Sequence, residues 1–136
     1  MSAVPEGKYV EIFDGYRVHY HEYGEGPAVI FVHGSGPGAS GWSNFRLNAP
    51  EIAAAGFRCL VPDMLGYGYS SITETPTFTY KDLVRGIVEF AAAVGAEDYT
   101  LVGNSMGGAV AITIGLEHPE RVRNLVLMAP GGLEDR

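Results

Sequence analysis

The sequence is poor in cysteine, in basic residues and in long apolar runs, and each shortage removes a class of protein. Its single cysteine, Cys59, excludes a disulfide within the chain and favours a reducing compartment. Nine basic against sixteen acidic residues give a net charge of −7, which argues against nucleic acid or an anionic membrane surface as the main partner. No apolar run is long enough to span a bilayer, and the first residues do not combine a basic region with an apolar one. We therefore expect a cytoplasmic protein that acts on small molecules.

What the sequence does have is an apolar content of 46%, enough for one domain with a hydrophobic core. Residue patterns predict strands over residues 8–13, 16–23, 28–32, 57–61 and 124–128, with a further strand around Leu101 and Val102. Helical periodicity predicts helices over residues 42–55, 80–94 and 106–117, the first broken or kinked at Pro50. This alternation predicts an α/β fold whose mostly parallel sheet lies between two helical layers, after an antiparallel edge hairpin turning at Asp14-Gly15.

Three sets of polar residues accompany the expected strands. His19 and His21 alternate onto one face of the second strand, but no third metal ligand is near, so we expect solvated residues and no metal site. Residues 33–38, His-Gly-Ser-Gly-Pro-Gly, follow a buried strand and would direct backbone N–H groups at an anion or oxyanion. Asp63 starts a glycine-rich loop, where we expect its carboxylate to hydrogen-bond loop backbone rather than act as a catalytic acid.

The strongest chemical signal is Gly103-Asn104-Ser105-Met106-Gly107, which lies between an expected strand and an expected helix. In this pattern the serine occupies a tight strand-to-helix turn that exposes its hydroxyl, and the glycines permit close backbone approach. The helix N-terminus beneath it favours negative charge. The sequence therefore predicts a nucleophile at Ser105, the alternative being a glycine-rich turn whose serine merely caps a helix.

A serine nucleophile needs a base, and in this arrangement the acid and then the histidine follow the serine along the chain. The acids and the histidine found after Ser105 are Glu117, His118, Glu120, Glu134 and Asp135. None of them follows a later core strand. His118 would lie at the far end of the helix that Ser105 begins, so we do not expect it to be the base.

Three motifs that follow successive strands resemble the α/β-hydrolase fold over nearly the whole chain. They are His33-Gly34-Ser35-Gly36, Asp63-x-x-Gly66-x-Gly68-x-Ser70 and Gly103-Asn104-Ser105-Met106-Gly107. Within that fold, residues 33–44, 103–108 and 127–132 are similar to the meta-cleavage product hydrolases. Those enzymes hydrolyse carbon–carbon bonds in aromatic degradation, in vinylogous diketones such as 2-hydroxy-6-oxohexa-2,4-dienoates. The resemblance implies a three-layer α/β-hydrolase core truncated after its sixth strand, with residues 1–136 as the N-terminal part of the core domain and the lid and C-terminal strands absent.

The resemblance also implies roles for particular positions. Ser105 would be the nucleophile, and the backbone N–H groups of Ser35 and Met106 would stabilise the oxyanion. Three residues would line the site of the substrate's dienoate end: Gly36, Asn44 and Asn104. No metal and no organic cofactor is implied. Because epoxide hydrolases and dehalogenases of this fold use an aspartate nucleophile, a serine at this position speaks against both.

The leading hypothesis is thus a serine-dependent hydrolase that cleaves a carbon–carbon bond beside a ketone. A carboxylesterase of the same fold and a non-catalytic binding or assembly fragment are the alternatives. The family's acid, histidine and lid would all lie beyond Arg136. We therefore expect these residues to be inactive alone, to require a complementing C-terminal half or second chain that supplies the aspartate and histidine, and to expose the sixth strand unless that partner or a homo-oligomer covers it.

Overall fold

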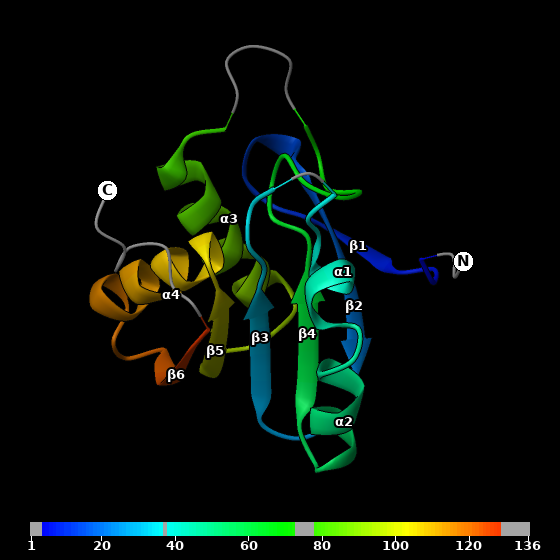
Figure 1. Ribbon diagram of the computed structural model, residues 1–136. Coiled ribbons are helices and arrows are strands. Elements are labelled where there is room, and N and C mark those ends of the chain that lie inside the picture. The colour runs from blue at the N-terminus through cyan, green and yellow to red at the C-terminus, as the bar shows by residue number, and fades with distance from the viewer. Residues whose placement is uncertain (1–3, 37, 73–77, 129–136) are drawn as a thin grey trace.

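The computed structural model describes residues 4–36, 38–72 and 78–128, which form a six-stranded sheet with helices on both faces (Figure 1). The strands lie in the order β1-β2-β4-β3-β5-β6. Their bounds are β1 Lys8–Glu11, β2 Arg17–Tyr23, β3 Ala28–Val32, β4 Arg58–Pro62, β5 Tyr99–Asn104 and β6 Val122–Met128. Strand β4 pairs parallel with β3, β3 with β5 and β5 with β6, whereas β1 and β4 each pair antiparallel with β2. The predicted mostly parallel sheet with an N-terminal antiparallel hairpin is confirmed.

The hairpin turns where the sequence predicted it. Asp14 and Gly15 have φ values of 55° and 75°, the positive pair that a type I′ turn requires. The N–H of Tyr16 closes the turn by donating to the carbonyl of Phe13 at 3.1 Å. Strand β2 then lies between β1 and β4, so it is an inner strand of the sheet.

Helices cover the two faces of the sheet in pairs. Their bounds are α1 Gly41–Phe45, α2 Ala49–Ala54, α3 Tyr80–Ala93 and α4 Met106–Glu117. Phe45 and Ala49 pack with Phe31 and the buried thiol of Cys59 on one face, while the larger cluster on the other face joins α3 and α4 to the sheet. The three-layer prediction is therefore confirmed (Figure 1). None of the helices in the described part of the chain is long and apolar enough to cross a membrane.

The region predicted as one broken helix over residues 42–55 is in fact two helices. Ser40 caps α1, since its hydroxyl accepts from the N–H of Ser43 at 3.0 Å. The chain turns at residues 46–48, and Pro50 lies in the first turn of α2. Backbone N–H groups in the first turn have no partner within the helix, so a proline there breaks no helical hydrogen bond. The break thus precedes the proline instead of lying at it.

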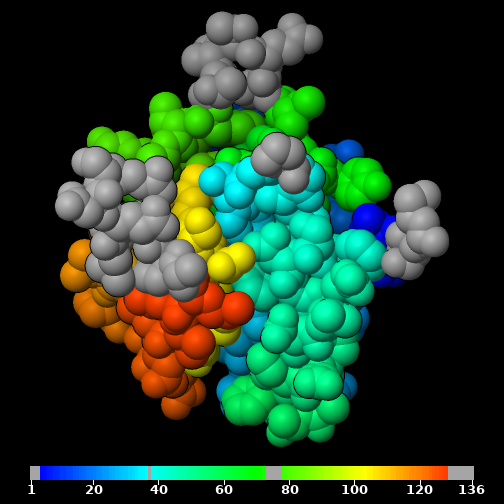
Figure 2. Space-filling view, in the orientation of Figure 1, coloured from blue at the N-terminus to red at the C-terminus, as the bar shows by residue number. Residues whose placement is uncertain are grey.

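Strand β6 forms an open edge of the sheet. It pairs only with β5 among the described strands, and Leu125, Val126 and Met128 are each more than 40% exposed, at 41%, 48% and 41%. Figure 2 shows this strand as part of the orange-red flank of the molecule. The expectation of an exposed sixth strand is confirmed for the described residues.

Tyr99, on the neighbouring strand β5, offers a test of packing in the hydrophobic core. Its side chain is fully buried and its hydroxyl has no hydrogen-bond partner among the described residues. A buried unpaired hydroxyl costs about 1–3 kcal/mol, so Tyr99→Phe should leave the free energy of unfolding unchanged or raise it by about 1 kcal/mol. Urea unfolding measures this, with Tyr80→Phe as the control, because the Tyr80 hydroxyl bonds Thr113 at 2.7 Å. A loss above about 1 kcal/mol for Tyr99→Phe would show that its hydroxyl is paired.

Candidate active site

Ser105 occupies a strained turn between β5 and α4. Its φ of 56° and ψ of −119° lie in a region that glycine favours, at a cost of about 1–3 kcal/mol for other residues. Two hydrogen bonds fix the turn: the N–H of Ser105 donates to the carbonyl of Met128 at 2.9 Å, and its carbonyl accepts from the N–H of Gly108 at 2.9 Å. The surrounding structure therefore maintains the strain that the predicted nucleophile turn requires.

The two glycines that flank Ser105 bring the turn against the end of β3. A Cβ atom on Gly103 would lie 2.6 Å from the Cα of Gly108, so β5 and α4 meet too closely for a side chain there. A Cβ on Gly107 would overlap the carbonyl oxygen of Val32, the last residue of β3. Helix α4 consequently begins beside the loop that follows β3.

That loop contacts the serine turn directly. An ideal Cβ on Gly34 would lie 3.1 Å from the Cβ of Ser105 and 3.2 Å from the carbonyl oxygen of Asn104. Asn44, on α1, joins the two segments, because its Oδ1 accepts from the N–H of Gly34 at 3.0 Å and from the Nδ2 of Asn104 at 2.9 Å. Two segments about seventy residues apart in the sequence are thus brought together at the carboxyl ends of β3 and β5.

These contacts determine which way the two amide groups face. The backbone N–H of Gly34 can only donate, so the Asn44 atom that it meets must be the oxygen. That oxygen already accepts two hydrogen bonds, and the NH₂ group of Asn44 keeps only a 3.5 Å contact with the hydroxyl of Ser43 among the described residues. Asn44 therefore offers a ligand a donor and no acceptor.

His33 ties the same loop to the end of β4. It is fully buried, its Nε2 accepts from the N–H of Met64 at 2.9 Å, and its Nδ1 donates to the carbonyl of Gly34 at 2.7 Å. Since the amide of Met64 can only donate, Nε2 carries no proton and the ring is neutral. Burial lowers the pKa of His33, partly offset by the hydrogen bond to Gly34.

A pH dependence of stability follows from the buried histidines. Burial lowers the pKa of both His21 and His33 below 6.5, so as the pH falls the unfolded chain binds protons first. The stability that these groups contribute is complete above about pH 6.5 and is lost as the pH falls toward their folded pKa values. We expect the free energy of unfolding, measured in urea, to decrease between about pH 7 and 5, and less steeply in His21→Leu. An unchanged slope in that variant would contradict the assignment for His21.

Asp63 organises the loop after β4, as predicted for a structural carboxylate. It is buried, and its Oδ1 accepts from the N–H of Gly41 at 2.8 Å while its Oδ2 accepts from the N–H of Tyr69 at 3.0 Å. A Cβ on Gly68 would overlap the carboxylate, and the hydroxyl of Ser70 donates to the carbonyl of Asp63 at 2.6 Å. The spacing Asp63-x-x-Gly66-x-Gly68-x-Ser70 thus wraps the loop around one buried charge.

The expectation that His19 and His21 are solvated is wrong. They are only 4% and 5% exposed, because β2 is covered by β1 and β4 as neighbours and by packing on both faces. Nδ1 of His19 lies 2.8 Å from Oδ2 of Asp63, a pairing that the sequence pattern did not reveal. The available signal was the alternation of Val18 and Tyr20 with the histidines, which is compatible with burial on both faces. The described residues contain no group of three or more side chains arranged to hold a metal.

The predicted site residues lie in three places. Ser105, Asn104 and Asn44 are brought together with Gly34, and Met106 begins α4 directly after the strained turn. Ser35 is exposed on the adjoining loop. Gly36, with a φ of 133°, lines a cavity of about 460 Å³ that also includes Trp42 and Asp63. The catalytic and binding roles of these residues remain predictions.

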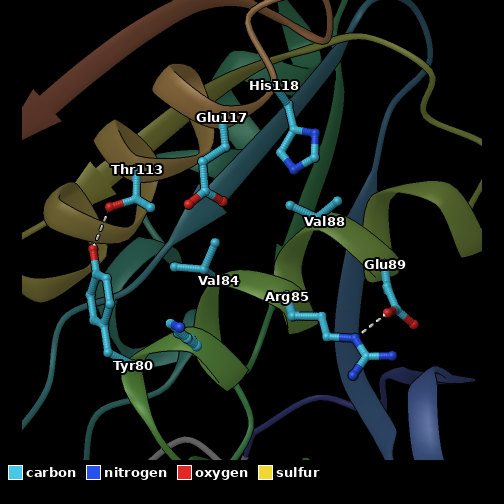
Figure 3. Close-up of a pocket in the computed structure, with 9 residues that line it drawn as sticks. Tyr80, Val84, Arg85, Val88, Glu89, Thr113, Glu117 and His118 are labelled. Carbon is cyan, nitrogen blue, oxygen red and sulfur yellow. Dashed lines mark hydrogen bonds and ion pairs between the residues drawn. The ribbon is translucent and has the colours of Figure 1, made fainter.

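His118 lies at the distal end of α4, as expected. The helix has 12 residues and so spans about 18 Å at 1.5 Å per residue, which separates His118 from Ser105. His118 instead borders a cavity of about 580 Å³ between α3 and α4, with Val84, Val88 and Glu117 (Figure 3). No described residue hydrogen-bonds the hydroxyl of Ser105, so the described part of the chain does not place a base beside it.

Comparison with known proteins adds independent findings. The family model described as the alpha/beta hydrolase fold matches residues 27–135. A 2-hydroxy-6-oxo-6-phenylhexa-2,4-dienoate hydrolase from Burkholderia cepacia is 40% identical over 140 residues, which cover 98% of this chain and 48% of that protein. A 2-hydroxymuconate semialdehyde hydrolase from Pseudomonas sp. (strain CF600) is 42% identical over 119 residues, 88% of this chain and 42% of that protein.

Solved structures give the same picture. The meta-cleavage product hydrolase CumD from Pseudomonas fluorescens IP01 superposes with a TM-score of 0.84 at 38% identity, covering 90% of this chain and 44% of CumD. An epoxide hydrolase from Vigna radiata superposes with a TM-score of 0.80 at 31% identity, covering 90% of this chain and 37% of that enzyme. The chain therefore spans about half the length, or less, of the relatives that it matches.

Proposed function

This chain belongs to the α/β-hydrolase fold family, and we propose that it carries the nucleophile and oxyanion hole of a serine-dependent carbon–carbon bond hydrolase. The substrate class is a vinylogous diketone of the 2-hydroxy-6-oxohexa-2,4-dienoate type, cleaved beside its ketone. The observation that carries this proposal is the strained Ser105 turn, held in contact with the loop after β3. The named relatives, which are hydrolases of this kind of compound, support the substrate class.

In this proposal Ser105 attacks the ketone carbonyl or assists addition of water to it. The N–H groups of Ser35 and Met106 stabilise the oxyanion that develops, and each such donor contributes roughly 2.7–4 kcal/mol to transition-state stabilisation. Asn44 and Asn104 lie beside Ser105, where their NH₂ groups suit the acceptor oxygens of a dienoate. Gly36 would line the same end of the substrate.

A serine nucleophile distinguishes this proposal from the epoxide hydrolases that share the fold. The superposition with the Vigna radiata enzyme reflects the common scaffold, which hosts several chemistries. A plain carboxylesterase would use the same turn, and no contact in the described residues favours it. An assay with a dienoate and an ester substrate distinguishes carbon–carbon bond cleavage from ester hydrolysis.

We further propose that residues 1–136 form the N-terminal part of the core domain, completed by a C-terminal segment or second chain that supplies the aspartate and histidine. Ser105 has no base among the described residues, and a serine hydroxyl is a weak nucleophile without one. The relatives that match are about twice as long as this chain. We therefore expect no serine-dependent turnover from the isolated 136 residues.

The test follows the absorbance of a coloured dienoate ring-cleavage product. The chain alone should leave the absorbance unchanged, and the chain with its complement should bleach it with release of two acids. An intact mass spectrum shows which polypeptides each preparation contains. Hydrolysis of an aryl ester without bleaching would replace the proposal by a carboxylesterase, and ligand binding without turnover in the complete preparation would replace it by a binding module. Turnover by the chain alone would contradict the need for a complement.

A further inference from the structure

We infer that His19 and Asp63 form a positioning pair that holds the oxyanion loop, of which the structure describes residues 34–36 and 38–40, in the conformation that the reaction requires. The inference rests on the proposed function, in which Ser35 of this loop donates to the oxyanion. Neither His19 nor Asp63 contacts Ser105 in the described structure, so their effect passes through the loop.

The carboxylate of Asp63 fixes the end of the loop. Gly41 follows the loop and begins α1, and its N–H donates to Asp63 Oδ1 at 2.8 Å. A Cβ on Gly41 would lie 2.6 Å from the carbonyl oxygen of Pro62, so the loop ends in backbone contact with β4. Helix α1 then carries Asn44, whose oxygen accepts from Gly34.

The start of the loop is held by Met64, the residue that follows Asp63. Nε2 of His33 accepts from the N–H of Met64, and Nδ1 of His33 donates to the carbonyl of Gly34. Both ends of the loop therefore depend on the position of two consecutive residues, Asp63 and Met64. A displacement there would move the loop as a whole relative to Ser105.

His19 supplies the third donor to the Asp63 carboxylate. The Nδ1 to Oδ2 distance is 2.8 Å, and the two side chains are only 5% and 3% exposed. Tyr9 and Tyr69 each pack against the imidazole with ring centroids 5.1 Å away, and the ring of His21 lies 5.0 Å away. A Cβ on Gly7 would overlap Nε2 of His19, so the N-terminal segment closes over the ring.

This packing gives the pair a physical role. A buried carboxylate is retained only where donors and a nearby positive or polar partner satisfy it. Without His19, only the two amides of Gly41 and Tyr69 would hold the charge, and the Asp63 carboxylate could reach water only if the loop moved away from β4. Since oxyanion donors act on the transition state, a looser loop should lower kcat and leave KM nearly unchanged.

The test compares three His19 variants with a matched control on the same strand. His19→Leu removes the donor to Asp63, and His19→Gln places its amide nitrogen near the position of Nε2, away from Asp63, whereas the amide of His19→Asn reaches the position of Nδ1. His21→Leu is the control for lost packing against the His19 ring, because His21 is equally buried on β2 and packs edge-on against His19 at 5.0 Å, while its Nε2 has no hydrogen-bond partner among the described residues. His19→Gln keeps a polar side chain if the leucine variant does not fold.

Amide hydrogen exchange of this chain decides whether the pair holds the loop. We expect His19→Leu and His19→Gln to accelerate exchange at Gly34 and Gly41 at least tenfold more than at Ser105, whose N–H bonds Met128. His19→Asn and His21→Leu should not. Equal acceleration in His19→Gln and His21→Leu would overturn the inference.

Kinetics of the complete enzyme decides whether holding the loop matters for the reaction. We expect kcat to fall at least tenfold in His19→Gln with KM within twofold, and both constants to stay within threefold in His19→Asn and His21→Leu. A raised KM with unchanged kcat would overturn the positioning role. If the unaltered complete enzyme shows no turnover, the proposed function fails, and the exchange result still judges the contact between the pair and the loop.

Discussion

Replacing Ser105 with alanine should reduce turnover of the complete enzyme by roughly 10³–10⁶-fold, because the hydroxyl is the proposed nucleophile. Steady-state loss of dienoate absorbance measures the effect. The matched control is Ser71→Ala, which removes a serine hydroxyl that accepts from the N–H of Arg17 at 2.8 Å, far from the strained turn in sequence. That control should retain activity within about threefold. Retention of more than a tenth of the activity in Ser105→Ala would remove Ser105 from the mechanism.

A glycine at the same position separates the chemical role from the structural one. Ser105 has a φ of 56°, so glycine relieves backbone strain there, whereas alanine keeps it. We expect Ser105→Gly to be inactive and to raise the free energy of unfolding by about 1 kcal/mol in urea, and Ser105→Ala to be inactive without that gain. Equal stability of the two variants would show that the turn carries no strain.

The sequence predicted the parts of this fold that local chemistry determines. The type I′ turn at Asp14-Gly15 and the helix of α4 starting at Met106 both follow from short patterns. Glycines at positions 103 and 107 predicted a close approach of backbone, and the structure gives the atoms that require it. Convergence of the loops after β3, β4 and β5 is a general property of parallel sheets, and the contacts of Gly34 with Ser105 and of His33 with Met64 bring all three loops together.

Contacts between residues far apart in the sequence could not be predicted from local sequence patterns. A hairpin at the edge of the sheet predicts a solvated His19, whereas β2 also pairs with β4 and is an inner strand. The alternation of Val18 and Tyr20 with the histidines is compatible with burial on both faces, but it does not identify β4 as the second partner of β2. The hydrogen bond from Met64 to His33 and the bridge from Asn44 to Gly34 likewise join segments whose proximity depends on strand order. Such contacts require the register of the sheet, which periodicity alone does not give.

The final prediction concerns the close backbone contact between Gly107, in the first turn of α4, and the end of β3. Gly107→Ala should lower the free energy of unfolding by about 3 kcal/mol or more, because its Cβ would overlap the carbonyl oxygen of Val32 and lie 2.5 Å from that of His33. Backbone atoms on both sides cannot yield as a flexible side chain can. The first turn of α4 must then move away from β3, and Ser105 moves with it.

Gly115→Ala is the matched control in the same helix. Its Cβ would meet only the side chain of Leu125, at 3.3 Å, and alanine improves helix propensity by up to about 1 kcal/mol, so stability should change by no more than about that amount. Urea unfolding of the two variants compares an identical chemical change at two contacts. If both glycines tolerate alanine equally, α4 is not seated on β3 as described, and the contact between Gly34 and Ser105 loses its structural basis. A large loss confined to Gly107→Ala, accompanied by loss of turnover in the complete enzyme, would show that one backbone contact between α4 and β3 determines the geometry of the site.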